Sequence, residues 1–197
     1  PNRTTLLRND DGIIEEVIDE MDDDAQLVDP SRIRLSTGGQ PYVAGMWEGE
    51  ASTTFMLQDL SGGKAVVAAR ITGLDKGTAY AVGHFSGGAS PEVVLYKPGE
   101  SAIRVAQPNR LETPPKTFDL SKPIKAIIPA FGGETALFLA LFGDGETATF
   151  FSFDGQSAPK ALLATEPEYG DLVFTAIQVG QSVLVFSGPD YSKFSTH

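Results

Sequence analysis

Three carboxylates and two histidines are the residues of this chain best suited to acid–base chemistry. Glu134, Asp144 and Glu146 lie close together in the sequence, and glycoside hydrolysis requires two carboxyl groups placed across a cleft. Asp144 stands between two glycines, however, and Gly-Asp-Gly is typical of a tight turn between strands, where acidic side chains are solvated. We therefore rank a glycoside hydrolase-like enzyme third among the candidate functions.

The histidines and the glycine-rich sequences add no catalytic or cofactor motif. His84 lies in a strand-like run and His197 is the last residue, and the chain has no cysteine to complete a zinc site. No Gly-x-Ser-x-Gly elbow is present, and Gly62-Gly63-Lys64 lacks the spacing and the hydroxyl residue of a phosphate-binding loop. The sequence predicts no metal, no cofactor and no catalytic residue, and we expect a protein that is not an enzyme.

Two aromatic residues occupy matching places in a repeated sequence. Trp47 and Phe85 each lie between a Tyr-x-x-Gly start and a Gly-x-Ala-Ser end, 38 positions apart. An exposed ring can stack on a sugar, so both are candidate ligand-stacking residues of a lectin-like, carbohydrate-binding β module, which is the alternative function. Aromatic side chains also bury large areas, and a core aromatic in each repeat is the interpretation that we favour.

The acidic residues are concentrated in one segment. Net charge is −11, and 10 of the 26 acidic residues lie between Asp10 and Asp29, with no Lys or Arg among them. The remainder has 16 acidic residues against 15 basic ones and is nearly neutral. Like charges in one short segment repel one another, so a positive partner surface or solvent must compensate them.

The same segment has an apolar stripe at helical spacing, which predicts a helix near Asp11–Met21. A solvated helix on its own domain, a docking arm for another subunit and a calcium site are the three interpretations, although Asp22-Asp23-Asp24 lacks the spacing and central glycine of a calcium loop. In the docking interpretation the partner-binding residues are Ile13, Ile14, Val17, Ile18, Met21, Asp19, Asp22, Asp23 and Asp24.

Charge and hydropathy also constrain the partners. A nucleic-acid binder needs a basic surface stripe, and none is visible in the sequence. No apolar run approaches the roughly 20 residues that cross a bilayer, and the acidity disfavours an anionic membrane surface. We expect a protein partner or further copies of this chain, no nucleic acid and no membrane. With no cysteine and no secretory signal, the localisation stays open between the cytoplasm and a particle assembled there.

Short β-prone runs separated by Gly and Pro indicate repeated hairpins. The clearest is Tyr80–Ala106, read as three strands with turns at Ser86-Gly87-Gly88 and Lys97-Pro98-Gly99-Glu100. Related runs start near residues 42, 136 and 182. Arg70-Ile71, Thr117-Phe118 and Val173-Phe174-Thr175 are candidate fourth strands, which a propeller blade would need.

The sequence therefore predicts an all-β fold of repeated antiparallel hairpins, either small and propeller-like or a sandwich or barrel, with one short N-terminal acidic helix or arm. We divide it into an arm over residues 1–31, ended by a break at Asp29-Pro30-Ser31, and a single β domain over residues 32–197. The function expected is a non-catalytic structural or assembly protein of a larger particle, for example a virion decoration or tail component, acting through protein–protein contacts in an oligomer.

Overall fold

The computed structural model describes most of the chain, from the first strand to the last. The backbone is described for residues 7–10, 13–16, 26–34, 41–50, 52–60, 66–86, 92–107, 115–131, 137–143, 148–165, 173–179, 182–188 and 195–196. Side chains are described for residues 42–50, 52–60, 66–86, 92–107, 115–129, 138–143 and 148–162. Throughout these residues the regular structure is β-strand, which confirms the predicted all-β class.

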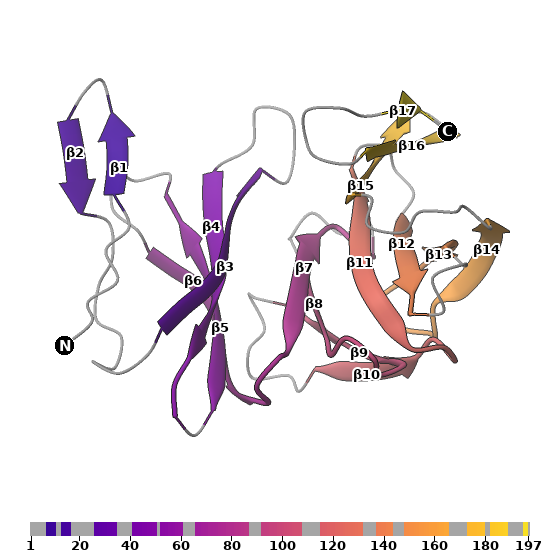
Figure 1. Ribbon diagram of the computed structural model, residues 1–197, viewed down its shortest axis with the longest axis horizontal. Coiled ribbons are helices and arrows are strands. Elements are labelled where there is room, and N and C mark those ends of the chain that lie inside the picture. The colour runs from indigo at the N-terminus through magenta and orange to yellow at the C-terminus, as the bar shows by residue number, and fades with distance from the viewer. Residues whose placement is uncertain are drawn as a thin grey trace. The chain divides into compact units, whose positions relative to one another are not determined.

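The chain divides into two compact units, Pro1–Lys76 and Gly77–His197. The first holds a two-stranded sheet and a four-stranded sheet (Figure 1). Its strands are β1 (Leu7–Asp10), β2 (Ile13–Glu16), β3 (Gln26–Arg34), β4 (Pro41–Glu48), β5 (Thr53–Asp59) and β6 (Val66–Leu74). The boundary expected at residue 31 lies inside β3, and the division after Lys76 was not expected.

Strands β1 and β2 form an antiparallel hairpin in which Leu7 pairs with Glu16 and Asp10 with Ile13. This hairpin lies in part of the range for which the sequence predicts a helix. The remainder of that range, residues 11, 12 and 17–21, is outside the described residues. Whether a helix forms anywhere in the acidic segment therefore stays a prediction.

The four-stranded sheet of the first unit is an antiparallel meander in the order β3-β4-β5-β6. The central strands bury side chains on both faces, because Met46 and Trp47 are neighbours on β4 and both are buried, as are Met56 and Leu57 on β5. Asp29-Pro30-Ser31 lies within β3, at a register shift between Val28 and Ser31. The predicted break is thus a bulge in an edge strand, where proline is tolerated.

The second unit begins with another four-stranded antiparallel meander, in the order β10-β9-β8-β7. Its strands are β7 (Ala79–Gly83), β8 (Glu92–Tyr96), β9 (Ala102–Ala106) and β10 (Lys116–Asp119). They match the three strands predicted for Tyr80–Ala106 and the candidate fourth strand at Thr117-Phe118. The turn after β8 has the expected form, with Gly99 at φ +91° and the Glu100 amide donating to the Lys97 carbonyl at 2.9 Å, because only glycine adopts positive φ without strain.

A third four-stranded meander follows: β11 (Ile124–Phe131), β12 (Leu137–Phe142), β13 (Ala148–Ser152) and β14 (Lys160–Thr165). The last residues of β11 also pair in parallel with β15 (Val173–Val179), which continues through β16 (Ser182–Gly188) to β17 (Ser195–Thr196). The sheet order is therefore β14-β13-β12-β11-β15-β16-β17. The residues near Val173, predicted as a fourth strand, instead begin this last group, and β14 is the fourth strand of the third meander.

The buried core of the second unit contains side chains from both of its meanders, β7–β10 and β11–β14. Phe138 packs edge-on against Phe85, with ring centroids 5.8 Å apart, and stacks on Phe151 at 5.3 Å. These rings belong to one buried cluster that also contains Val94 of β8 and Ile103 of β9. The opposite face of the third meander holds a smaller buried cluster of Leu139, Leu141, Ala148 and Phe150.

Candidate functional site

The predicted partner-binding residues lie mainly outside the described part of the chain. Ile13 and Ile14 are in β2, where the backbone is described without side chains. The others fall outside the described residues: Val17, Ile18, Asp19, Met21, Asp22, Asp23 and Asp24. The glycosidase-type carboxylates Glu134, Asp144 and Glu146 fall outside as well. The backbone thus shows that part of the acidic segment is extended and paired, and the role of its side chains stays a prediction.

The two candidate stacking residues are both buried. Trp47 lies on β4 with 2% of its surface exposed, and Phe85 lies just beyond the end of β7 with 1% exposed. A sugar would reach either ring only if the surrounding core opened, because a buried ring presents no face to solvent. Carbohydrate stacking stays a prediction for these residues, and burial favours their core role.

The matching sequences around these rings do not occupy matching strands. Trp47 lies within the second strand of its meander, whereas Phe85 follows the first strand of the next one. The repeat at residue 42 thus begins one strand later than the repeat at residue 80. Shared turn chemistry, with glycine after an aromatic residue, explains the similarity better than equivalent positions in two blades do.

A polar cluster at one end of the second unit was not predicted from the sequence. Glu92, the first residue of β8, is 2% exposed. One carboxylate oxygen accepts a hydrogen bond from the Ser86 amide at 2.6 Å, and the other accepts one from the Ser86 hydroxyl at 2.6 Å and from Gln107 Nε2 at 3.5 Å. A buried carboxylate needs such donors, because burying an unpaired charge is costly. We call Ser86, Glu92 and Gln107 the Glu92 cluster.

The loop after β13 lies against this cluster. A Cβ added to Gly155 would stand 2.9 Å from Ser86 Cβ and 3.9 Å from Glu92 Oε1, and the residue has φ +76°. Lys116 of β10 donates to the Gly155 carbonyl at 2.9 Å and to Gln156 Oε1 at 2.6 Å. The loop therefore lies close to the Glu92 cluster on one side and is hydrogen-bonded to Lys116 of β10 on the other.

Asp154 shapes the same loop from within. Its side chain accepts hydrogen bonds from the amides of Ser157 at 2.7 Å and Gln156 at 2.8 Å. These bonds, led by that of Ser157, hold the pKa of Asp154 below its usual value of 3.8, because they favour the ionised form. Phe153, one residue earlier, packs edge-on against Phe118 at 5.1 Å. The turn thus rests on an aromatic pair as well as on polar contacts.

The Glu92 cluster fixes Ser86, in the loop after β7, to the start of β8. Both oxygens of the carboxylate accept hydrogen bonds, one from the Ser86 amide and the other from the Ser86 hydroxyl. Its sequence signal is faint: a serine before Gly-Gly and a glutamate at the start of an apolar run. Gln107 and Gly155 come from distant parts of the chain, and only the fold brings them together.

The first unit has a different polar character. Thr53 Oγ1 and Gln58 Oε1 are buried on β5 without a hydrogen-bond partner among the described residues. Tyr42 of β4 pairs with Asp59 across the strands, and partial burial, followed by the nearby Asp59 charge, raises the pKa of the Tyr42 phenol above 10.0. In the described part of this unit, two buried polar side chains therefore lack the kind of hydrogen bonds that Glu92 accepts in the second unit.

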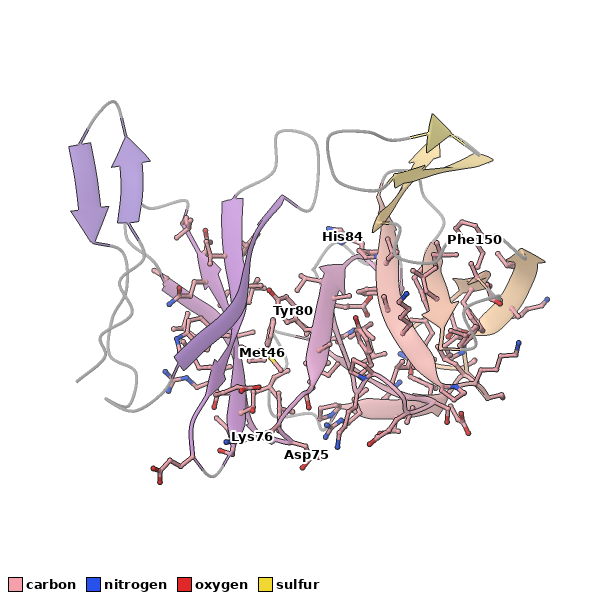
Figure 2. The ribbon with its side chains drawn as sticks, in the orientation of Figure 1. Met46, Asp75, Lys76, Tyr80, His84 and Phe150 are labelled. Carbon is pink, nitrogen blue, oxygen red and sulfur yellow. The ribbon has the colours of Figure 1, made fainter. Side chains whose placement is uncertain are left out.

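The described residues show no metal centre and no membrane-spanning helix. No group of three or more His, Cys, Asp or Glu side chains is placed to hold a metal ion within the described part. His84 follows the end of β7 and is half-buried (Figure 2). Within the same residues no helix is long and apolar enough to cross a membrane.

Comparison with protein-family models finds no match, and neither does comparison with curated protein sequences. The functional argument therefore rests on the residues of this chain.

Proposed function

We propose that this protein is a non-catalytic structural component of a larger particle, for example a virion decoration or tail component, and that it acts through protein–protein contacts. The observation that carries the proposal is the charge distribution: ten acidic residues without a single Lys or Arg between positions 10 and 29, beside a nearly neutral remainder. A free domain gains nothing from such self-repulsion, whereas complementary charge guides the encounter and orientation of two protein surfaces.

The strand arrangement supports the same proposal. Three consecutive four-stranded meanders, β3–β6, β7–β10 and β11–β14, are the type of unit that builds a propeller-like fold, which we favour over a sandwich or barrel. Such repeated sheets offer extended, rigid surfaces and edges rather than a deep cleft. They suit a protein that is built into an assembly.

Native mass in solution tests the proposal most directly. We expect sedimentation equilibrium to show an oligomer that weakens as salt rises from about 0.05 to 0.5 M, because exposed charges are screened over about 8–10 Å at physiological ionic strength. A variant lacking residues 1–24 should remain folded and lose assembly. This deletion spares β3, which begins at Gln26, whereas removing residues 1–29 would shorten that strand.

Two results would contradict the proposal. One is a monomer at every concentration and salt level, and the other is unchanged assembly after the deletion. Unfolding of the deletion variant, followed by the fluorescence of Trp47, would instead make the acidic segment an ordinary part of its own domain.

A further inference from the structure

Strand β6 is an open edge that exposes apolar side chains. It is the last strand in the order β3-β4-β5-β6 and pairs only with β5 among the described residues. Val66 is 62% exposed and Val67 47%, and they are two of the three large hydrophobic side chains found exposed in the described part. An open edge with adjacent exposed valines can pair with another strand.

The other edge of this sheet differs. Strand β3 contains Pro30 and the bulge between Val28 and Ser31, and both features discourage the addition of a further strand. Strand β6 has register shifts too, on either side of Ala69–Ile71. They leave only short regular stretches, so β6 suits a short partner strand rather than a long one.

Strand β6 and its flanks are also basic. Between residues 64 and 76 the sequence has Lys64, Arg70 and Lys76 against a single acid, Asp75. Arg70 and Lys76 are exposed (Figure 2 shows Lys76 beyond the end of β6). This edge is a positive segment in a chain of net charge −11, which favours an acidic occupant.

The β1–β2 hairpin is an acidic partner that pairs with no third strand among the described residues. It forms a two-stranded sheet of its own, and an isolated hairpin is at best marginally stable in water. Its second strand, β2, consists of Ile13, Ile14, Glu15 and Glu16. Four residues match the short regular stretches of β6.

We propose that β2 of one copy adds to the β6 edge of a second copy, so that the hairpin extends the four-stranded sheet. This inference rests on the proposed assembly function and names its surface. The order of residues favours parallel addition, since it places Ile13 and Ile14 beside Val66 and Val67, and Glu15 and Glu16 next along the edge toward Arg70. Main-chain hydrogen bonds then supply affinity, and the side chains supply specificity.

The opposite charges of β2, which ends in Glu15 and Glu16, and of the basic β6 segment point to a second copy of this chain as the occupant. The hairpin and the edge are different surfaces, so the contact is heterologous. Reciprocal exchange between two copies closes it into a dimer, and one-way addition continues it into a longer array.

Site-specific cross-linking gives the sharpest test, because the chain has no cysteine. Two full-length variants, Ile14→Cys and Val67→Cys, are mixed under mild oxidation. Only contact between copies can join them, and we expect a mixed disulfide dimer in preference to either homodimer. Replacing Val67→Cys by Leu162→Cys is the matched control, because Leu162 is 53% exposed on β14, the edge strand of another sheet.

Charge reversal supplies the second arm. Arg70→Glu should raise the dissociation constant of the assembly about tenfold, equivalent to about 1.4 kcal/mol. Glu15→Arg with Glu16→Arg should do the same, and combining all three changes should restore assembly. Lys160→Glu, an exposed cation on β14, should leave assembly unchanged. Trp47 fluorescence and circular dichroism verify that each variant is folded.

The outcomes separate the inference from the proposed function. Assembly that survives Arg70→Glu, or a mixed disulfide that forms with Leu162→Cys and not with Val67→Cys, overturns the β6 contact and leaves the assembly function standing. A wild-type protein that is monomeric at every concentration overturns both. Failure of the triple variant to restore assembly, with folding intact, overturns the pairing of the glutamates with Arg70.

Discussion

The two units of this protein differ in how completely their loops, strand edges and buried polar groups are paired among the described residues. In the second unit, hydrogen bonds fix loops at both ends of the meanders: at one end Glu92 accepts hydrogen bonds from Ser86, in the loop after β7. At the other, the Gly99 amide donates to the Ile124 carbonyl and the Ile124 amide to the Glu100 carbonyl. Among the described residues of the first unit, β6 pairs only with β5, two buried oxygens on β5 have no hydrogen-bond partner, and the β1–β2 hairpin pairs with no third strand.

This difference suggests that the two units have different roles. Unpaired polar groups and open edges cost stability unless something else completes them. Both units have edge strands, but the buried oxygens without a hydrogen-bond partner among the described residues, Thr53 Oγ1 and Gln58 Oε1, both belong to the first unit. Under the proposed assembly function, the first unit would supply the contact surface through β6 and the β1–β2 hairpin.

Loss of the Phe85 ring should destabilise the second unit and leave the stability of the first unchanged. Phe85→Ala removes a fully buried ring that packs on Phe138, so it should lower the free energy of unfolding by about 3–5 kcal/mol. Circular dichroism follows the whole chain during denaturation. Trp47, the only tryptophan, reports on the first unit, and its fluorescence midpoint should stay constant.

A loss below about 1 kcal/mol, accompanied by lost binding to a glycan array, would instead favour the carbohydrate-binding alternative. Equal shifts of the two midpoints would show that the units unfold together.

Removal of the Glu92 carboxylate should have the next largest effect. Glu92→Ala leaves the Ser86 amide and hydroxyl without their acceptor and should destabilise the second unit by about 1.5–3 kcal/mol. Gln107→Ala, which removes only the 3.5 Å contact, should cost much less. Chemical denaturation of both variants measures the difference, and equal losses would contradict the anchoring role.

The close approach of Gly155 can be separated from its backbone conformation by a matched pair. Gly155→Ala and Gly99→Ala both force alanine into positive φ, but the new methyl group at 155 also meets Ser86, whereas nothing lies within 4 Å at 99. Both should lose about 1 kcal/mol or more, and Gly155→Ala should lose distinctly more. Thermal midpoints of the two variants test this, and a larger loss at 99 would rule out tight packing of the loop.

Removal of a buried hydroxyl without a hydrogen-bond partner should stabilise the first unit. Thr53→Val replaces an unpaired buried hydroxyl by a methyl group of similar shape, so it should raise the free energy of unfolding by about 1 kcal/mol. The Trp47 fluorescence midpoint measures this gain. As a control, Thr149→Val changes a buried threonine of β13 in the second unit and should leave that midpoint unchanged. A destabilised Thr53→Val protein would mean that the hydroxyl is paired.

The hairpins could be predicted from the sequence because their signals are local. Gly and Pro mark the turns, and branched apolar runs mark the strands, so β8, β9 and the fourth strands β6 and β10 were found. Strand β14 was missed because Lys160–Thr165 is a short run rich in Ala and Leu, which favour helices, with no β-branched residue before Thr165.

The two units and the Glu92 cluster depend on distant contacts, which periodicity does not report. Gly83 lies between these cases. A glycine inside a strand-like run suggests either a bulge or a close backbone approach, and a Cβ at Gly83 would stand 2.7 Å from Pro129 Cβ on β11. The sequence indicated one of these two features at this position, and only the fold identifies the neighbour.

The parallel pairing of β11 with β15 has a consequence for the order of folding. Ala130 and Phe131 pair with Ala176 and Ile177, so this ladder closes only after the chain has passed through β12, β13 and β14. Each meander can form from neighbours in sequence, whereas this ladder must first overcome the entropy of a long loop. We therefore expect β15–β17 to join last, and refolding of the second unit to show its slowest step there.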